Sequence, residues 1–456
     1  MPAGSEPSYR RGAALLSALI GVTGVLTYAF HSLTAHALGS DQYGLIAVLW
    51  AAVFLTASVI YRPVEQLLSR TLAERLARSR SPAPALRVAA TIQLALAAVF
   101  VIVALLLRGR VEDDLFSGQS TLSWALVAGV VFYAASYFAR GFLAGQQRFG
   151  LYGGLVLMES ASRVVFAVIV LAALGVSAGR NLSALAIAAA PLLSLIVVPW
   201  ALGGQVRRLS ERRDAGAAGE GPEFTLAHGV GFAGAVLVVM VSEQAILNSG
   251  VLIVKLQTDS DKLAALIFAM LMIARAPLQL FQAVSTTLLP HLTRLLVREE
   301  ESAQAGNFAR SVRLTVGACL SFGAVTVAGV LIAGPPVMRL LFGSDFSYGR
   351  LDLVLVAAGM GLYLAATTIN QAVLAQGRAR HAAGAWAAAA AFFVAFLLVA
   401  DMREVREVAV AFVATAALLC SLLYAVYRRP LGRDEALRPG SLEELEVRLA
   451  AADEGS

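Results

Sequence analysis

Several ionisable residues lie inside long apolar stretches of the sequence, where a charge is costly and usually functional. Arg275 lies 13 residues after the start of the apolar stretch 262–289, close to its middle. A guanidinium group donates several hydrogen bonds in a fixed plane, so it suits the oxygens of a phosphate or pyrophosphate. Glu243 lies in the preceding stretch. It is a candidate for binding a coupling proton or cation, or else it neutralises Arg275 in an ion pair.

A second group of charges falls in the stretches 121–144 and 151–175. Glu159 and Arg163 are four residues apart, so they share one face of a helix. Arg140 approaches from the end of the stretch before them. We expect an Arg-Glu-Arg cluster that holds helices together, or alternatively a cationic vestibule for an anionic substrate.

Two further residues have alternative interpretations. Arg62 ends the second apolar stretch, where it either receives a phosphate or extends to the membrane interface as many helix-end arginines do. His31 lies in the first stretch and can titrate near neutral pH, which makes it a candidate for ion coupling. The plainer interpretation of His31 is a hydrogen-bonded histidine within a helix.

The composition excludes most soluble classes of protein. The chain has 456 residues, of which 58% are hydrophobic and 14% charged, whereas soluble proteins average about 25% charged residues. The two cysteines, Cys319 and Cys420, lie in apolar stretches and read as buried hydrophobic residues. Neither of the two lysines, Lys255 and Lys262, follows a glycine, so the chain lacks the P-loop signature of an ATPase.

The elements that must position these charges are membrane-spanning helices. A bilayer core about 30 Å thick requires about 20 apolar residues per helix. Twelve such stretches occur, at 12–37, 43–62, 86–107, 121–144, 151–175, 182–203, 226–254, 262–289, 308–333, 350–376, 382–400 and 405–427. The sequence therefore predicts an all-α polytopic membrane protein.

The segments between the stretches differ in charge. With both termini in the cytoplasm, 25 arginines fall on the cytoplasmic side and 9 basic residues fall outside. This bias follows the positive-inside rule and predicts that orientation. It also accounts for the net charge of +6 through anionic lipid headgroups, so we expect no nucleic-acid partner.

A weak internal repeat divides the chain. Arg62-Pro63 near the end of the second stretch resembles Arg275-Ala276-Pro277 in the eighth. Six spans per half give both halves the same orientation, which predicts a parallel repeat of two six-helix lobes around a central cavity. The predicted parts are an N-terminal lobe at 1–203, a cytoplasmic linker at 204–225, a C-terminal lobe at 226–427 and a cytoplasmic tail at 428–456.

Four motifs carry a family resemblance over nearly the whole chain. They are Leu38–Leu45, Ser285–Leu292, Leu341–Phe346, and the paired turns Leu143–Arg148 and Leu374–Arg378. In this order they resemble the polysaccharide flippase branch of the multidrug/oligosaccharidyl-lipid/polysaccharide exporter superfamily. Relatives often carry an acidic residue after an Asn in the seventh span, whereas here Asn248 is followed by Ser249.

The resemblance implies a secondary transporter that flips undecaprenyl-pyrophosphate-linked oligosaccharide from the cytoplasmic to the outer leaflet of a bacterial plasma membrane. The residues expected to bind the substrate are Arg275, Arg62, Arg140 and Arg163, and the candidates for ion coupling are Glu243, Glu159 and His31. We expect a monomer, with membrane lipids and with the glycan polymerase and glycosyltransferases of the same pathway as partners.

Two alternatives belong to different classes. A small-molecule or multidrug cation antiporter of the same fold would need an acidic cavity, whereas the buried candidates here are at least as basic as acidic. A glycan polymerase or ligase would need catalytic residues in a large outer loop, but the segment 108–120 offers only Glu112, Asp113 and Asp114 without partners. We therefore expect no enzyme activity, no cofactor and no metal site.

Overall fold

The structure of the protein is a computed structural model. The described residues are 6–77, 80–173, 175–198, 230–275, 277–278, 292, 306–400 and 404–429. Within these ranges all regular elements are helices. Ten of them are long and apolar enough to cross a membrane, which makes the chain a multi-pass membrane protein.

The first two predicted spans lie in one continuous element, α1 (Glu6–Ala77). Gly39 interrupts it with φ 71° and ψ 172°, a backbone conformation that suits glycine because it has no Cβ. The polar segment after Gly39 is therefore a sharp change of direction between two helices rather than the loop expected from the sequence. Helix α1 also continues through Pro63 to Ala77, beyond the second predicted span.

The other predicted spans match the observed helices closely. In the first half these are α2 (Ala83–Leu106), the short α3 (Arg108–Arg110) and η1 (Val111–Leu115), α4 (Ser120–Gly145), α5 (Phe149–Ala173), α6 (Val176–Ser194) and η2 (Leu195–Val197). In the second half they are α9 (Val230–Thr258), α11 (Asn307–Phe342), α12 (Arg350–Ala375), α13 (Ala379–Val399) and α14 (Val405–Tyr427). Residues 261–275 of the eighth span are helical, and 279–289 lie outside the described residues.

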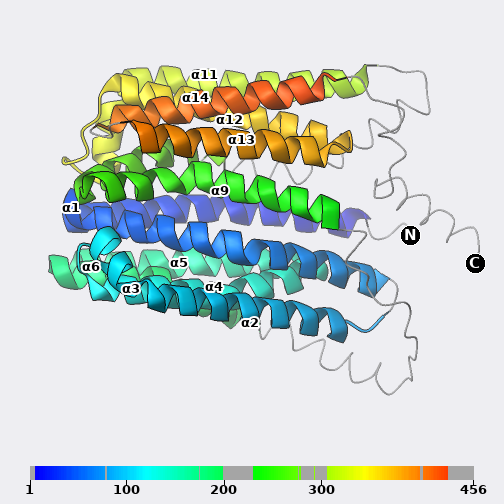
Figure 1. Cartoon of the computed structure of the whole chain (residues 1–456), viewed down its shortest axis with the longest axis horizontal. Coiled ribbons are helices and arrows are strands. Elements are labelled where there is room, and N and C mark those ends of the chain that lie inside the picture. Colours follow the sequence, from blue (N-terminus) through cyan, green and yellow to red (C-terminus); the bar gives the residue numbers. More distant parts are fainter. Residues whose placement is uncertain are drawn as a thin grey trace, which may run out of the picture.

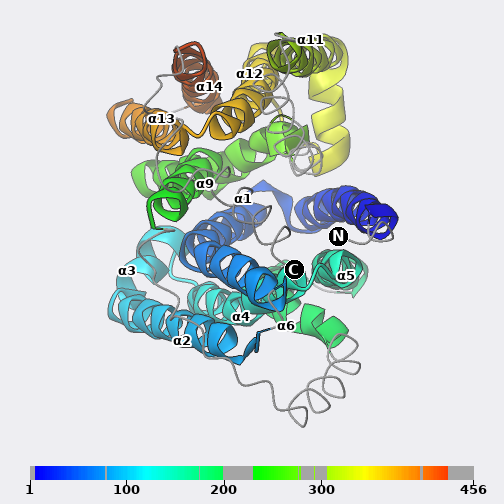
Figure 2. The ribbon, with the colours of Figure 1, turned by 90° about the vertical axis from the view of Figure 1, so that its right-hand side faces the viewer.

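The helices form two groups side by side, which confirms the predicted two-lobe fold (Figures 1 and 2). Helices α1 to α6 pack on one another in the first lobe, and α9 and α11 to α14 pack in the second. The lobes meet mainly where α1 lies along α9. The start of α1 and the end of α14 lie at the same end of the bundle (Figure 1). The predicted linker 204–225 lies outside the described residues, so the lobe boundaries stay predictions.

The outer faces of the helices are apolar. Leu106 of α2 and Val325, Ile332 and Leu340 of α11 are each at least 70% exposed. Such a surface is stable in lipid and would aggregate in water.

Helices α11 and α12 cross at two glycines, Gly323 and Gly361. A Cβ on Gly323 would lie 2.7 Å from the Cα of Gly361. Gly323→Ala is therefore expected to lower the free energy of unfolding by about 1–3 kcal/mol through overpacking. Gly317→Ala on the same helix meets nothing within 4 Å, so this control should be neutral or stabilising by up to about 1 kcal/mol. Thermal unfolding of both variants in detergent measures this; equal midpoints would show that the glycines do not set the crossing.

Candidate functional site

A buried charged cluster lies inside the first lobe. The Glu159 carboxylate of α5 accepts hydrogen bonds from Arg163 Nη2 (2.5 Å), from the Tyr133 hydroxyl (2.6 Å) and from Arg140 Nη2. Glu159 is 4% exposed and Arg163 is 2% exposed. The structure thus brings together the three residues that the spacing grouped, and it adds Tyr133 to them.

Aromatic rings surround the two arginines of this cluster. The Arg163 guanidinium carbon lies 5.0 Å from the ring centre of Trp50 and 5.5 Å from that of Phe54. Arg140 lies over the ring of Tyr137 at 4.9 Å. Ring faces attract cations, and in a desolvated site such contacts reinforce the ion pairs. The cluster is therefore built to hold α1, α4 and α5 together, with one excess positive charge.

Tyr133 is a residue that sequence reasoning missed. It donates to Glu159 and accepts a hydrogen bond of 2.5 Å from Arg163 Nη2. Tyr133, Tyr137 and Arg140 follow one another at spacings of four and three residues, so they lie on one face of α4. That polar stripe in an apolar helix was the signal that could have identified it.

Arg275 lies at the end of the described helix 261–275, about 21 Å from its start at a rise of about 1.5 Å per residue. Its Nη2 donates to the Leu247 carbonyl oxygen at 2.5 Å and to Asn248 Oδ1 at 3.0 Å, both on α9. Its guanidinium carbon lies 4.6 Å from the ring centre of Phe268. All of these partners are neutral.

The alternative of an ion pair between Arg275 and Glu243 is wrong for this structure. Among the described residues no carboxylate forms a salt bridge with Arg275. The guanidinium is held at Leu247 and Asn248, one helical turn past Glu243. Glu243 instead interacts electrostatically with Arg62 across the junction of the lobes. Asn248 is followed by Ser249, and the side chain of α9 that bonds to Arg275 is the neutral Asn248 amide.

Arg62 joins the first-lobe cluster to the junction of the lobes. It interacts electrostatically with Glu65, which also interacts with Arg140. Tyr152 donates a hydrogen bond of 3.1 Å to Glu65 Oε1. Arg275 and Arg163 contact the same aromatic cluster, through Phe268 and Trp50. The four predicted arginines therefore belong to one region, together with the three glutamates Glu65, Glu159 and Glu243.

His31 lies where the lobes touch. Its Nδ1 is 3.1 Å from the Tyr43 hydroxyl oxygen. Its ring centre lies 4.4 Å from that of Trp50 and 4.7 Å from that of Phe268 in the second lobe. Nε2 is buried and has no hydrogen-bond partner among the described residues. This arrangement resembles a packed aromatic cluster more than an open ion site.

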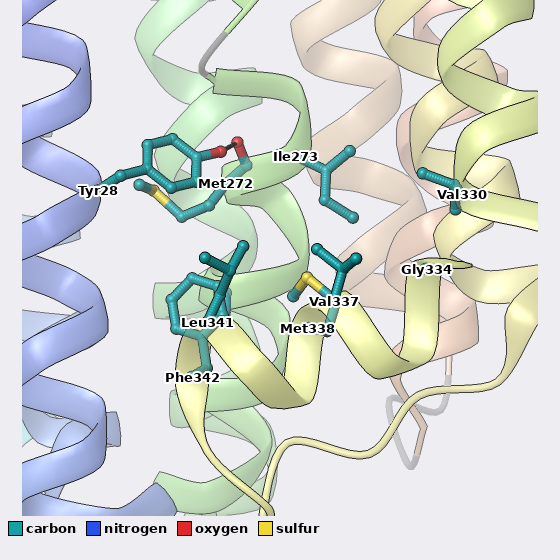
Figure 3. A pocket seen from close by; sticks show the side chains of 10 residues that line it. Tyr28, Met272, Ile273, Val330, Gly334, Val337, Met338, Leu341 and Phe342 are labelled. Carbon is teal, nitrogen blue, oxygen red and sulfur yellow. Dashed lines mark hydrogen bonds between the residues drawn. The ribbon is translucent and has the colours of Figure 1, made fainter. Parts of the chain in front are cut away.

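An apolar cavity of about 190 Å³ lies between α1, the helix 261–275 and α11 (Figure 3). Met272, Ile273, Val337 and Met338 are among its lining residues. The Tyr28 hydroxyl extends from α1 and donates to the Met272 carbonyl oxygen (Figure 3). These apolar side chains suit the hydrocarbon part of a ligand rather than a charged group. Among the described residues no group of three His, Cys, Asp or Glu could hold a metal ion.

Comparisons with known proteins identify the fold. No protein-family model matches the chain, and no curated protein matches it. Among solved structures, an inward-facing multidrug resistance MATE family transporter of the MOP superfamily matches with a TM-score of 0.62 and 13% identity, over 91% of this chain and 93% of the other. The outward-facing conformation of such a transporter matches with a TM-score of 0.58 and 14% identity, over 98% and 97%.

A mutant of the Vibrio cholerae MATE transporter VcmN matches with a TM-score of 0.58 and 16% identity, over 93% of this chain and 98% of the other. These neighbours are transporters rather than enzymes. The similarity spans nearly the full length of each protein. The chain therefore has the two-lobe, twelve-helix fold of the MATE transporters of the MOP superfamily.

Proposed function

We propose that the protein is a secondary transporter that moves a pyrophosphate-linked lipid oligosaccharide, of the undecaprenyl type, from the cytoplasmic to the outer leaflet of a bacterial plasma membrane. The fold supports transport by rocking of two lobes. The interior arginines support an anionic substrate. Both termini are cytoplasmic in this proposal, and the protein acts as a monomer alongside the polymerase and glycosyltransferases of the pathway.

The observation that carries the proposal is the set of neutral partners around Arg275. Arg275 is half-buried, and a cation withdrawn from water without a carboxylate partner is unfavourable. Charges at membrane depth usually serve function. Two neutral oxygens and one ring hold Arg275 in place. An entering pyrophosphate would supply the missing negative charge and accept the remaining N–H groups.

The other predicted residues contribute to substrate binding and ion coupling to different extents. Glu159 already neutralises much of the charge of Arg140 and Arg163, so these arginines shape the vestibule more than they bind phosphate. Arg62 interacts with Glu243 at the junction of the lobes and suits a headgroup entering from the cytoplasm. Within the described residues the Glu243 carboxylate accepts no hydrogen bond, which makes it the best candidate to bind the coupling ion.

A cation antiporter is the second candidate. The neighbours named as multidrug transporters and the Glu243 carboxylate favour it. An acidic, aromatic cavity would attract organic cations. The excess of arginines over glutamates in the same region opposes it, because each cation entering would meet Arg275 without a compensating carboxylate.

Ligand-induced thermal stabilisation separates the two functions. We expect a polyprenyl-pyrophosphate saccharide to raise the unfolding temperature of the purified protein, because a ligand at 100 times its Kd adds about 2.7 kcal/mol of stability. Ethidium and tetraphenylphosphonium should leave the unfolding temperature unchanged. Stabilisation by these cations but not by the pyrophosphate lipid would favour the antiporter and contradict the proposal.

A further inference from the structure

The two lobes are joined at one end of the bundle by a lysine that is completely buried. Lys255, near the end of α9, is 0% exposed. Its Nζ donates to Asp259 Oδ1 (2.5 Å) and to the Ser117 hydroxyl (2.9 Å), and it lies 3.0 Å from Asp261 Oδ1. Ser117 comes from the loop after η1 in the first lobe, whereas the aspartates belong to the second lobe. The lysine therefore connects the lobes directly.

The backbone around Lys255 is unusual at two of these partners. Ser117 has φ 50° and Asp259 has φ 49°, values in the left-handed region that side chains other than glycine rarely adopt. Ser117 also donates to Asp261 Oδ2 at 3.3 Å. Such conformations persist only where surrounding contacts hold them. Here the Lys255 ammonium donates a hydrogen bond to the side chains of both residues.

The lobes approach each other closely beside this lysine. A Cβ on Gly44 of α1 would lie 1.9 Å from the Asp261 carbonyl oxygen, so only glycine fits there. The neighbouring Tyr43 ring packs edge-on against Phe268 and Phe346 of the second lobe. Polar and aromatic contacts thus seal the same end of the junction, the end that the charge bias predicts to be extracytoplasmic.

The other half of the junction has no comparable seal in the described part of the chain. Within the described residues Arg62 and Glu243 form no salt bridge with each other. The charged hydrogen bonds that link Ser117 to Lys255 and Asp261 join the lobes at the opposite end.

We propose that an extracytoplasmic gate is formed by Lys255 with Ser117, Asp259 and Asp261, and by the close contact at Gly44. These contacts must break before the junction of the lobes opens outward. This inference rests on the transporter part of the proposed function but not on the identity of the substrate.

The lysine content of the chain provides a direct test. Lys255 and Lys262 are the two lysines, and Lys262 is exposed beside the gate. An amine-acylating ester applied to the detergent-purified full chain should modify Lys262 at least about tenfold faster than Lys255, since a tenfold ratio requires only about 1.4 kcal/mol in favour of the closed gate. Peptide mass spectrometry gives both rates from one sample.

Gly44→Ala should force the lobes apart and bring the Lys255 rate to within about threefold of the Lys262 rate, because the closed state is no longer the more stable one. Gly109→Ala is the matched control: it lies near the same end of the bundle, and nothing lies within 4 Å of its added Cβ. The control should leave the ratio of rates unchanged. Since no substrate is added, the result is independent of the ligand-binding test.

Ser117→Ala removes one partner of Lys255 without adding bulk, so it decides the question if Gly44→Ala fails to fold. It should raise the Lys255 rate several-fold while leaving the Lys262 rate constant. Equal rates for the two lysines in the unmodified protein would overturn the gate. An unchanged ratio in Ser117→Ala, and in Gly44→Ala where that variant folds, would overturn it as well.

Discussion

Replacing Glu159 with glutamine should lower the free energy of unfolding by about 3–5 kcal/mol, the range seen when one partner of a buried ion pair is removed. Arg140 and Arg163 would then lie in the interior without their shared carboxylate. The variant keeps the shape of the side chain, so the loss reports charge rather than packing. Thermal or denaturant unfolding in detergent measures it.

A salt bridge of the same kind near the surface serves as the control for Glu159. Glu112 pairs with Arg108 at 3.3 Å with the same four-residue spacing, but these side chains are 21% and 39% exposed. Glu112→Gln should cost no more than about 1 kcal/mol. If Glu159→Gln cost as little as the control and yet stopped transport, the cluster would serve ion coupling instead of stability.

Arg275→Ala should abolish transport while leaving the protein at least as stable as before. The substrate would lose one or more charge-assisted hydrogen bonds, each worth about 1.5–3 kcal/mol, so its affinity should fall by about 10- to 100-fold. Within the described part of the chain the folded protein loses bonds to neutral oxygens and no ion pair. This combination separates a substrate-binding arginine from a structural one.

Two further variants sharpen the test of Arg275. Arg275→Lys keeps the charge but loses the planar array of donors, so partial activity is expected. Arg310→Ala removes an exposed arginine of α11 in the same lobe and should have no effect on transport. A fall in unfolding temperature for Arg275→Ala as large as that for Glu159→Gln would instead make Arg275 a structural residue.

Much of the fold was predictable because a bilayer allows little besides apolar helices of fixed length. Within the described residues the predicted spans were confirmed, and so was the arrangement of the helices in two lobes. The end of the eighth span, 279–289, lies outside these residues. The sequence predicted a loop between the first two spans, whereas the structure has a kink at a single glycine, Gly39, with φ 71°. Local composition does not distinguish a sharp kink from a short loop.

The site was predicted where its residues lie on one helical face or at the facing ends of consecutive helices, as Arg140 and Glu159 do. Glu159 and Arg163 are one helical turn apart, so their pairing could be inferred. The partners of Arg275 could not be inferred, since the rotation of α9 against the helix 261–275 decides whether Glu243 or Asn248 faces it. Lys255 meets Ser117 across 138 positions of the chain, and no periodicity reports such a contact.

In the proposed function Arg275 binds the pyrophosphate of a lipid-linked saccharide during transport. The most direct measurement reconstitutes the protein in vesicles and follows a fluorescent polyprenyl-pyrophosphate oligosaccharide from one leaflet to the other. We expect flipping by the unmodified protein and by Arg310→Ala, and none by Arg275→Ala. Flipping by Arg275→Ala at the unmodified rate, or no flipping by the unmodified protein, would contradict the claim.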